Sequence, residues 1–160
     1  LIAEKGNPKV DVLFGGPVET FGAGVKEGIF EAYKPPSAAA LPARFKHEGG
    51  MWTAIADDPL VFMTNRKFLA DNKLAAPTSL RDLTKADWAK RVVLESPATS
   101  SPGMAFLLAT IAAFPEGSDY PWQQYWADLK KNGAKVAAGW SDAYYTDFSG
   151  SSGKGRVLVR

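Results

Sequence analysis

Hydrophobic positions along this chain follow two alternating spacings, and the alternation predicts the class of fold. Apolar residues and helix-start signals predict helices within 20–33, 66–77, 78–91, 101–114, 120–133 and 141–150. Short apolar runs predict strands at 10–14, 91–96, 134–140 and 156–160, with two more β-like runs on either side of Asp57-Asp58-Pro59. Alternating helices and short strands indicate an α/β structure with a mostly parallel sheet and flanking helices.

Turn-forming residues mark the ends of these elements. Gly15 and Gly16 stop the first strand, and Thr78 or Ser79 is suited to cap a helix. The proline- and glycine-rich segment 34–50 predicts irregular surface with one short helical turn. Residues 150–155 lack the spacing of a phosphate-binding loop, so they predict a turn before the last strand.

Composition restricts the possible chemistry more than charge does. The chain has 160 residues, 46% of them hydrophobic, and a formal net charge of +2 without any block of Lys or Arg, which argues against a nucleic-acid partner. Cysteine is absent and His47 is the single histidine, so thiolate chemistry, a histidine-based triad and a multi-histidine metal site are excluded. No stretch approaches the ~18 apolar residues of a transmembrane helix. The chain starts and ends in mid-pattern, so we expect a fragment or a processed chain.

The segment Ala98–Gly103 carries the most suggestive chemistry. Pro102 suits the first position of the helix, which makes Ser101 the expected N-cap, and Gly103 allows a close backbone approach. Hydroxyls and free N–H groups at a helix start can bind an anion, and the carboxyl end of a parallel strand is where ligands tend to bind. An ordinary capped helix after a strand is the alternative interpretation.

Several quoted stretches resemble one protein family along nearly the whole chain. "NPKVDVLFGG", "GIFEAYKPP", "PLVFMTNRKFL" and "LAAPTSLRDLTKADWAKRVVLESPATSSPG" are similar to periplasmic solute-binding proteins of ABC transporters, in the two-lobed type II group with iron(III)-, phosphonate- and thiamine-binding members. "GWSDAY" and "DFSG" look most like the thiamine-binding branch. The resemblance implies no cofactor, no enzyme activity, an extracytoplasmic location with or without a lipid anchor, and a membrane permease as partner.

The resemblance also implies an incomplete two-lobed structure that closes on its ligand. Residues 1–56 would belong to the first lobe, and residues 57–160 would hold a crossing strand and most of the second lobe. By resemblance, the ligand's hydroxyl or phosphate end faces Ser100, its ring faces Trp140, and the loop is completed by Thr99, Ser101 and Gly103. A cationic aromatic ring such as thiazolium would stack on Trp or Tyr.

Further candidate ligand contacts are Asp142, Tyr144, Gly15 and Gly16, each with a structural alternative. Tyr144 and the adjacent Tyr145 point about 100° apart on a regular helix, so they converge only on irregular backbone. Asp147 is expected to be solvated. The face formed by Trp122, Tyr125, Trp126 and Leu129 is expected to be core.

The expected function is capture of thiamine or thiamine phosphate for an ABC importer. The alternative within the family is Fe(III) with a synergistic anion. A small α/β enzyme acting on a phosphorylated substrate is a weaker alternative, because no acid–base pair is evident. An isolated lobe without its own ligand would expose apolar surface and self-associate, for example by strand exchange.

Overall fold

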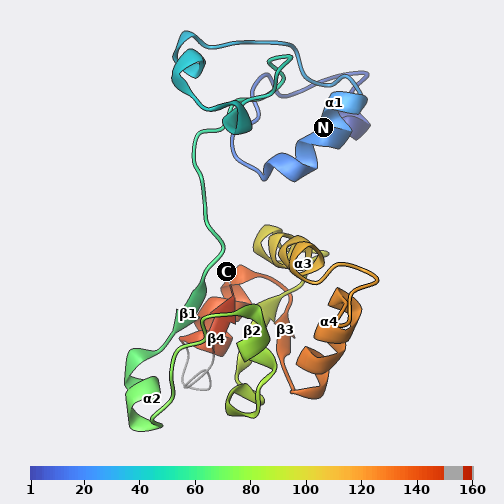
Figure 1. The fold of residues 1–160 in the computed structure, drawn as a ribbon. Coiled ribbons are helices and arrows are strands. Elements are labelled where there is room, and N and C mark those ends of the chain that lie inside the picture. Colours follow the sequence, from blue (N-terminus) through green and yellow to red (C-terminus); the bar gives the residue numbers. More distant parts are fainter. Residues whose placement is uncertain (150–156, 160) are drawn as a thin grey trace. The chain divides into compact units, whose positions relative to one another are not determined.

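The computed structural model describes residues 1–149 and 157–159, and the chain forms two compact units, Leu1–Asp58 and Pro59–Arg160 (Figure 1). The turn predicted for residues 150–155 lies outside the described residues. The division at Asp58 falls two residues beyond the expected end of the first lobe, and the assignment of the units to two lobes stays a prediction.

The first unit contains little regular structure. Its α-helix, α1, spans Phe21–Lys26, and Gly28 follows it with a φ of +63°, as expected for a glycine that ends a helix. Lys46 and Thr53 form an isolated antiparallel bridge. The predicted irregular segment 34–50 holds two short 3₁₀ helices rather than one turn, and the unit's 3₁₀ helices are Ile2–Glu4, Val18–Thr20, Pro36–Ala40 and Ala43–Phe45.

The strand predicted at residues 10–14 does not form. Val12 and Phe14 are 78% and 81% exposed, and no backbone hydrogen bond joins residues 10–14 to any other residue that the structure describes. A strand needs a neighbouring strand to satisfy its N–H and C=O groups, and the described part of the first unit offers none. The exposed run is compatible with the expected self-association, which stays a prediction.

The second unit is built on a four-stranded sheet with the order β1-β4-β2-β3 (Figure 1). Strand β2 pairs in parallel with both β3 and β4, whereas β1 pairs antiparallel with β4. The mostly parallel sheet confirms the predicted fold class. The strands are β1 at Phe62–Thr64, β2 at Val92–Glu95, β3 at Lys135–Ala137 and β4 at Val157–Val159.

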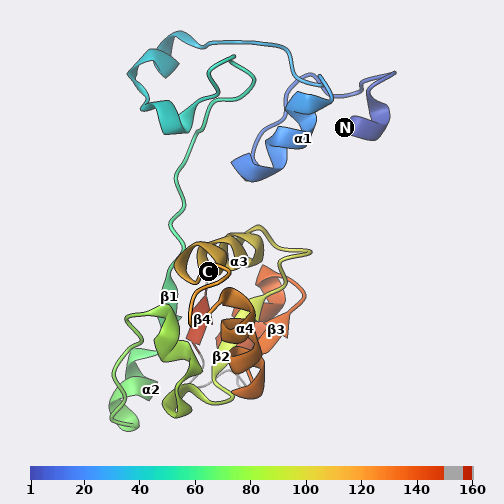
Figure 2. The same ribbon diagram turned by 45° about the vertical axis from the view of Figure 1, so that its right-hand side comes forward.

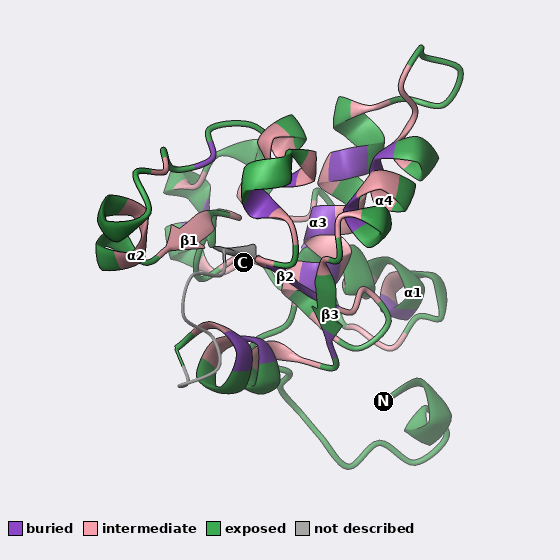
Figure 3. Cartoon of the chain, turned by 90° about the horizontal axis from the view of Figure 1, so that it is seen from below, coloured by how far each residue is buried: buried purple, intermediate pink, exposed green. Residues whose placement is uncertain are grey.

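Helices cover both faces of this sheet (Figures 2 and 3). Val92 and Leu94 belong to the main core with Phe106 and Tyr125, whereas Val93 packs on the opposite face with Ala143. This alternation follows from the two-residue period of a strand and explains why β2 is apolar on both sides. The helices of this unit are α2 at Arg66–Asp71, α3 at Ser101–Ala113, α4 at Trp122–Lys131, 3₁₀ helices at Leu80–Thr84 and Ala86–Trp88, and a π-helix at Asp142–Phe148.

Local signals set several helix ends. Ser79, one of two predicted caps, starts a 3₁₀ helix through a capping box in which its hydroxyl accepts from the Asp82 N–H and the Asp82 carboxylate accepts from the Ser79 N–H. Helix α2 ends at Asp71, six residues before the predicted stop at Pro77, because Lys73 takes a left-handed φ of 53°.

Among the described residues, no helix has the length and apolarity to cross a bilayer.

The predicted apolar face of α4 is core. Tyr125 and Leu129 are buried, and Trp126 packs against the same cluster while its Nε1 donates to Thr110 Oγ1 over 2.9 Å. Burial raises the pKa of Tyr125 well above its ordinary value, and its hydroxyl donates to the Leu80 carbonyl over 3.0 Å. This tyrosine therefore stays protonated and links α4 to the start of a 3₁₀ helix.

Candidate functional site

The parallel strands β2 and β3 end at the same edge of the sheet, and the candidate site lies there. The Ser96 N–H donates to the Ala137 carbonyl over 2.9 Å, and the Thr99 hydroxyl donates to the Ala138 carbonyl over 2.5 Å. The loop before α3 is thereby tied to the segment that leads to Trp140. The structure thus brings together the two segments that sequence reasoning selected separately.

The predicted N-cap of α3 is wrong by one residue. Ser100, not Ser101, is the N-cap: its backbone is extended and its carbonyl accepts from the Met104 N–H over 2.9 Å. Pro102 is then the second helical residue, which is equally acceptable because an N–H at that position has no partner within the helix. The exposed Ser101 takes the first helical position.

The Ser100 side chain does not cap the helix. Its hydroxyl donates to Oε2 of Glu95, the last residue of β2. Glu95 is 1% exposed, and its Oε1 has no hydrogen-bond partner among the described residues. Sequence reasoning missed Glu95, although a carboxylate that ends the otherwise apolar run Val92–Leu94 is an available signal.

Gly103 is required by the packing of the chain itself. A β-carbon at this position would lie 2.5 Å from the Glu95 carbonyl oxygen and 2.7 Å from both the carbonyl carbon and oxygen of Ser96. Gly103 was expected to let a ligand approach the backbone closely. The backbone at the end of β2 takes that place instead. This contact sets how near the first turn of α3 lies to Glu95.

Aromatic side chains gather around Trp140, directly after the loop's contact with Ala138. The Trp140 ring stacks on Tyr144 at 5.2 Å and 9°, and Tyr145 meets both rings edge-on. The predicted helix is present, but it is a π-helix, a form often found at functional sites. Its irregular backbone brings the adjacent tyrosine rings to a 5.1 Å centroid separation.

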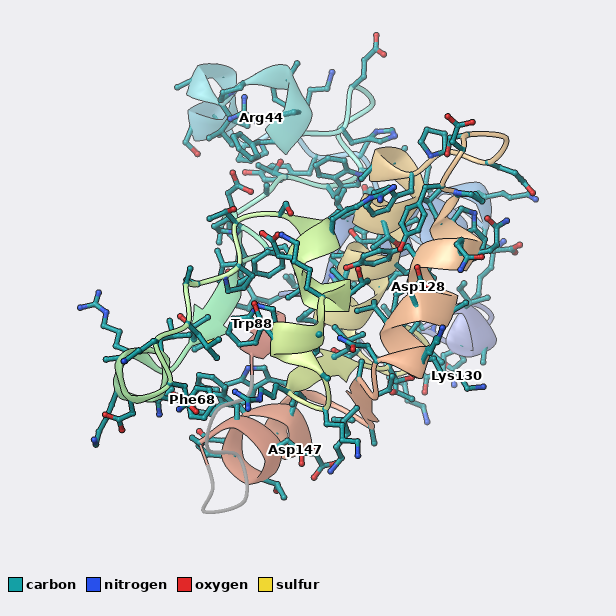
Figure 4. The ribbon with its side chains drawn as sticks, turned by 60° about the horizontal axis from the view of Figure 1, so that its bottom comes forward. Arg44, Phe68, Trp88, Asp128, Lys130 and Asp147 are labelled. Atoms are coloured by element: carbon teal, nitrogen blue, oxygen red, sulfur yellow. The ribbon has the colours of Figure 1, made fainter. Side chains whose placement is uncertain are left out.

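The two acidic residues of the π-helix differ in their surroundings. Asp142 is exposed in the first turn, where it is available to a cation. Asp147 (labelled in Figure 4), expected to be solvated, is buried. Its Oδ1 accepts from Lys135 Nζ over 2.5 Å. The expectation failed because the pairing partner lies on β3, twelve residues earlier, beyond the reach of local pattern.

The remaining predicted residues, Gly15 and Gly16, belong to the first unit. Both are exposed and have φ values of +83° and +113°, so they form a left-handed turn. A contribution of these glycines to the same site stays a prediction. The first unit also has a cavity of about 260 Å³, whose charged lining residues are Glu4, Lys5, Lys9 and Asp11.

A metal centre built from conventional ligands is not found in the described part of the chain. No group of three or more His, Asp or Glu side chains there is arranged to hold a metal ion. The polar groups near the loop are instead hydroxyls, backbone N–H groups and one buried carboxylate, beside an aromatic surface. Such a set suits an organic ligand with an oxygen-bearing end and a ring.

Comparison with known proteins identifies the family of this chain. Residues 7–159 match the family described as bacterial extracellular solute-binding protein. The chain belongs to this family. The match confirms the family resemblance and the extracytoplasmic location, and it places the chain among binding proteins rather than enzymes.

Individual relatives point in the same direction. The thiamine-binding periplasmic protein of Escherichia coli is 31% identical over 147 residues, which cover 91% of this chain and 42% of that protein. A probable ABC transporter periplasmic-binding protein of Sinorhizobium fredii is 35% identical over 125 residues, covering 76% of this chain and 34% of the relative. A solved structure of a periplasmic thiamin binding protein aligns with 99% of this chain and 46% of its own, with a TM-score of 0.63 and 26% identity. The chain therefore spans less than half the length of these relatives.

Proposed function

We propose that this chain forms part of the ligand-binding component of an ABC importer and that its ligand is thiamine or a phosphate ester of thiamine. The observation that carries the proposal is the junction of the α3 start with the Trp140 aromatic cluster through the bond from Thr99 to Ala138. The names of the relatives support thiamine as the ligand.

The two halves of the junction suit the two ends of such a molecule. A thiazolium ring is cationic and aromatic, so it stacks on Trp140 or on Tyr145, which is 60% exposed, with about 0.5–2 kcal/mol per contact. Asp142 provides an exposed negative charge next to that surface. The hydroxyl or phosphate end of the ligand then lies at the loop of Thr99, Ser100 and Ser101, with Gly103 setting the position of the helix start.

A tryptophan-fluorescence titration tests the proposal. The chain is titrated with thiamine, thiamine phosphate, Fe(III) citrate and inorganic phosphate, and the titrations are repeated with Trp140→Ala. Trp122→Ala is the matched control, because Trp122 is also half-buried in the second unit but begins α4. We expect saturable quenching by a thiamine compound that is lost in Trp140→Ala and kept in Trp122→Ala.

Other outcomes overturn the ligand assignment. Quenching by Fe(III) citrate without a response to thiamine would identify the iron-binding alternative, in which the same loop, Thr99 to Gly103, holds a synergistic anion. Quenching that survives in Trp140→Ala would show that the ligand's ring does not bind at this aromatic cluster. Silence toward every compound would overturn the proposed function of this chain.

A further inference from the structure

Glu95 is the buried acidic group that the proposed site leaves unexplained. It ends β2 with 1% exposure, directly beneath the first turn of α3. One carboxylate oxygen accepts from the Ser100 hydroxyl, and the other is buried without a hydrogen-bond partner in the described part of the chain. A buried carboxylate with one unpaired oxygen is costly, so a role beyond packing is a reasonable hypothesis.

The bond to Glu95 changes what Ser100 can offer a ligand. A serine hydroxyl has one proton to donate and two lone pairs that accept. Because the proton is directed at Glu95 Oε2, the Ser100 oxygen presents only lone pairs to an incoming group. It can then accept a hydrogen bond from a ligand, but it cannot donate one to a phosphate oxygen.

The helix start still provides donors. The N–H groups of Ser101 and Gly103 donate to no described residue, as is normal for the first turn of a helix. A ligand hydroxyl satisfies both halves of this arrangement, because it can donate to Ser100 and accept from the helix. A phosphate oxygen would meet the Ser100 lone pairs and, close behind them, the negative charge of Glu95.

Glu95 also lies on the face of the sheet where the aromatic cluster packs. Side chains alternate along a strand, so Glu95 shares its face with Val93, which packs with Ala143 and Tyr144. Glu95 thus lies on the same sheet face as Tyr144, on which the Trp140 ring stacks. The carboxylate acts through Ser100 and does not need to contact the ligand itself.

We propose that Glu95 is a positioning residue that makes this site select a ligand ending in a neutral hydroxyl over one ending in a phosphate. This inference rests on the proposed function and refines it. Within the thiamine class, it assigns unphosphorylated thiamine as the preferred ligand.

Calorimetric titration of the chain with thiamine and with thiamine phosphate tests this inference. We expect the wild type to bind thiamine more tightly, and Glu95→Gln to shift the affinity ratio toward the phosphate ester by about tenfold, or about 1.4 kcal/mol. Glu116→Gln is the matched control, because it makes the same change on an exposed side chain of the same unit and should leave the ratio unchanged. Urea unfolding of each variant verifies that it is folded.

A second variant keeps the test valid if Glu95→Gln does not fold. Ser100→Ala removes the acceptor, so it should weaken thiamine binding by about tenfold and weaken phosphate-ester binding less. A wild type that prefers the phosphate ester, or variants that leave the ratio unchanged, would overturn the inference while the proposed function stands. Absence of binding to either compound would overturn the proposed function and this inference with it.

Discussion

Replacing Gly103 with alanine tests how closely the start of α3 packs against the end of β2. In an unobstructed helix, alanine is more favourable than glycine by roughly 1 kcal/mol. Here the added methyl group would lie 2.5 Å from the Glu95 carbonyl oxygen and 2.7 Å from backbone atoms of Ser96, which cannot rotate away as a side chain can. The first turn of the helix must therefore shift, and such overpacking costs about 1–3 kcal/mol.

The matched control is Gly139→Ala in the same unit. A β-carbon on Gly139 meets nothing within 4 Å, and its φ is not in the left-handed range. This substitution should leave stability unchanged or raise it by about 0.4–1 kcal/mol, because alanine restricts the unfolded chain. Gly103→Ala is thus expected to lower stability, whereas Gly139→Ala is not.

Urea unfolding and thermal melting, followed by tryptophan fluorescence, measure both variants. The second unit spans about 100 residues, so each kcal/mol corresponds to ~4–8 °C in Tm. Four of the five tryptophans report on this unit: Trp88, Trp122, Trp126 and Trp140. A Gly103→Ala variant as stable as wild type, with the same dependence on urea, would refute the described contact between α3 and β2.

Three further predictions concern the second unit. Thr110→Val leaves the indole N–H of Trp126 without its acceptor and should cost about 1–3 kcal/mol in urea unfolding. Lys135→Met removes the cation that pairs with buried Asp147 and should cost about 1.5–3 kcal/mol in the same assay. The Asp82 carboxylate accepts hydrogen bonds from Lys85 and from the Thr78 and Ser79 N–H groups, and these bonds hold its pKa well below 3.8. The stability that the charged Asp82 contributes is therefore present at neutral pH and fades as pH falls below about 4. In unfolding measured from pH 7 to pH 2, the stability difference between Asp82→Asn and wild type should therefore be largest at pH 7. The difference should shrink as the pH falls.

Elements with strong local signals could be predicted well. Helix α4 has apolar residues at helical spacing and a glycine beyond its end, and β2 is a short apolar run. The structure places both where their patterns indicated, because burial of a regular apolar face decides such elements. The segment 10–14 has an equally apolar pattern and forms no strand, because strand formation also requires a hydrogen-bonding neighbour.

The segments that form the candidate site could be predicted from the sequence, but the contacts between their side chains could not. Thr99, Ser100 and Trp140 were selected from motif and resemblance, and the structure joins their segments through Thr99 and Ala138. The position of the N-cap was wrong by one residue, because Ser100 and Ser101 are chemically equivalent choices before Pro102. Glu95 was missed because its partner, Ser100, belongs to the next element.

The sequence by itself determined the α/β class and the loop that starts α3, since both depend on residue spacing over short stretches. It also indicated the family, through motifs that resemble those of known members. Only the tertiary structure decided which polar groups meet: Ser100 with Glu95, and Lys135 with Asp147. Such pairs join different elements, and a side chain's partner depends on how strands and helices pack. Packing also made Gly103 a steric requirement, because the backbone atoms that surround it come from the end of a strand.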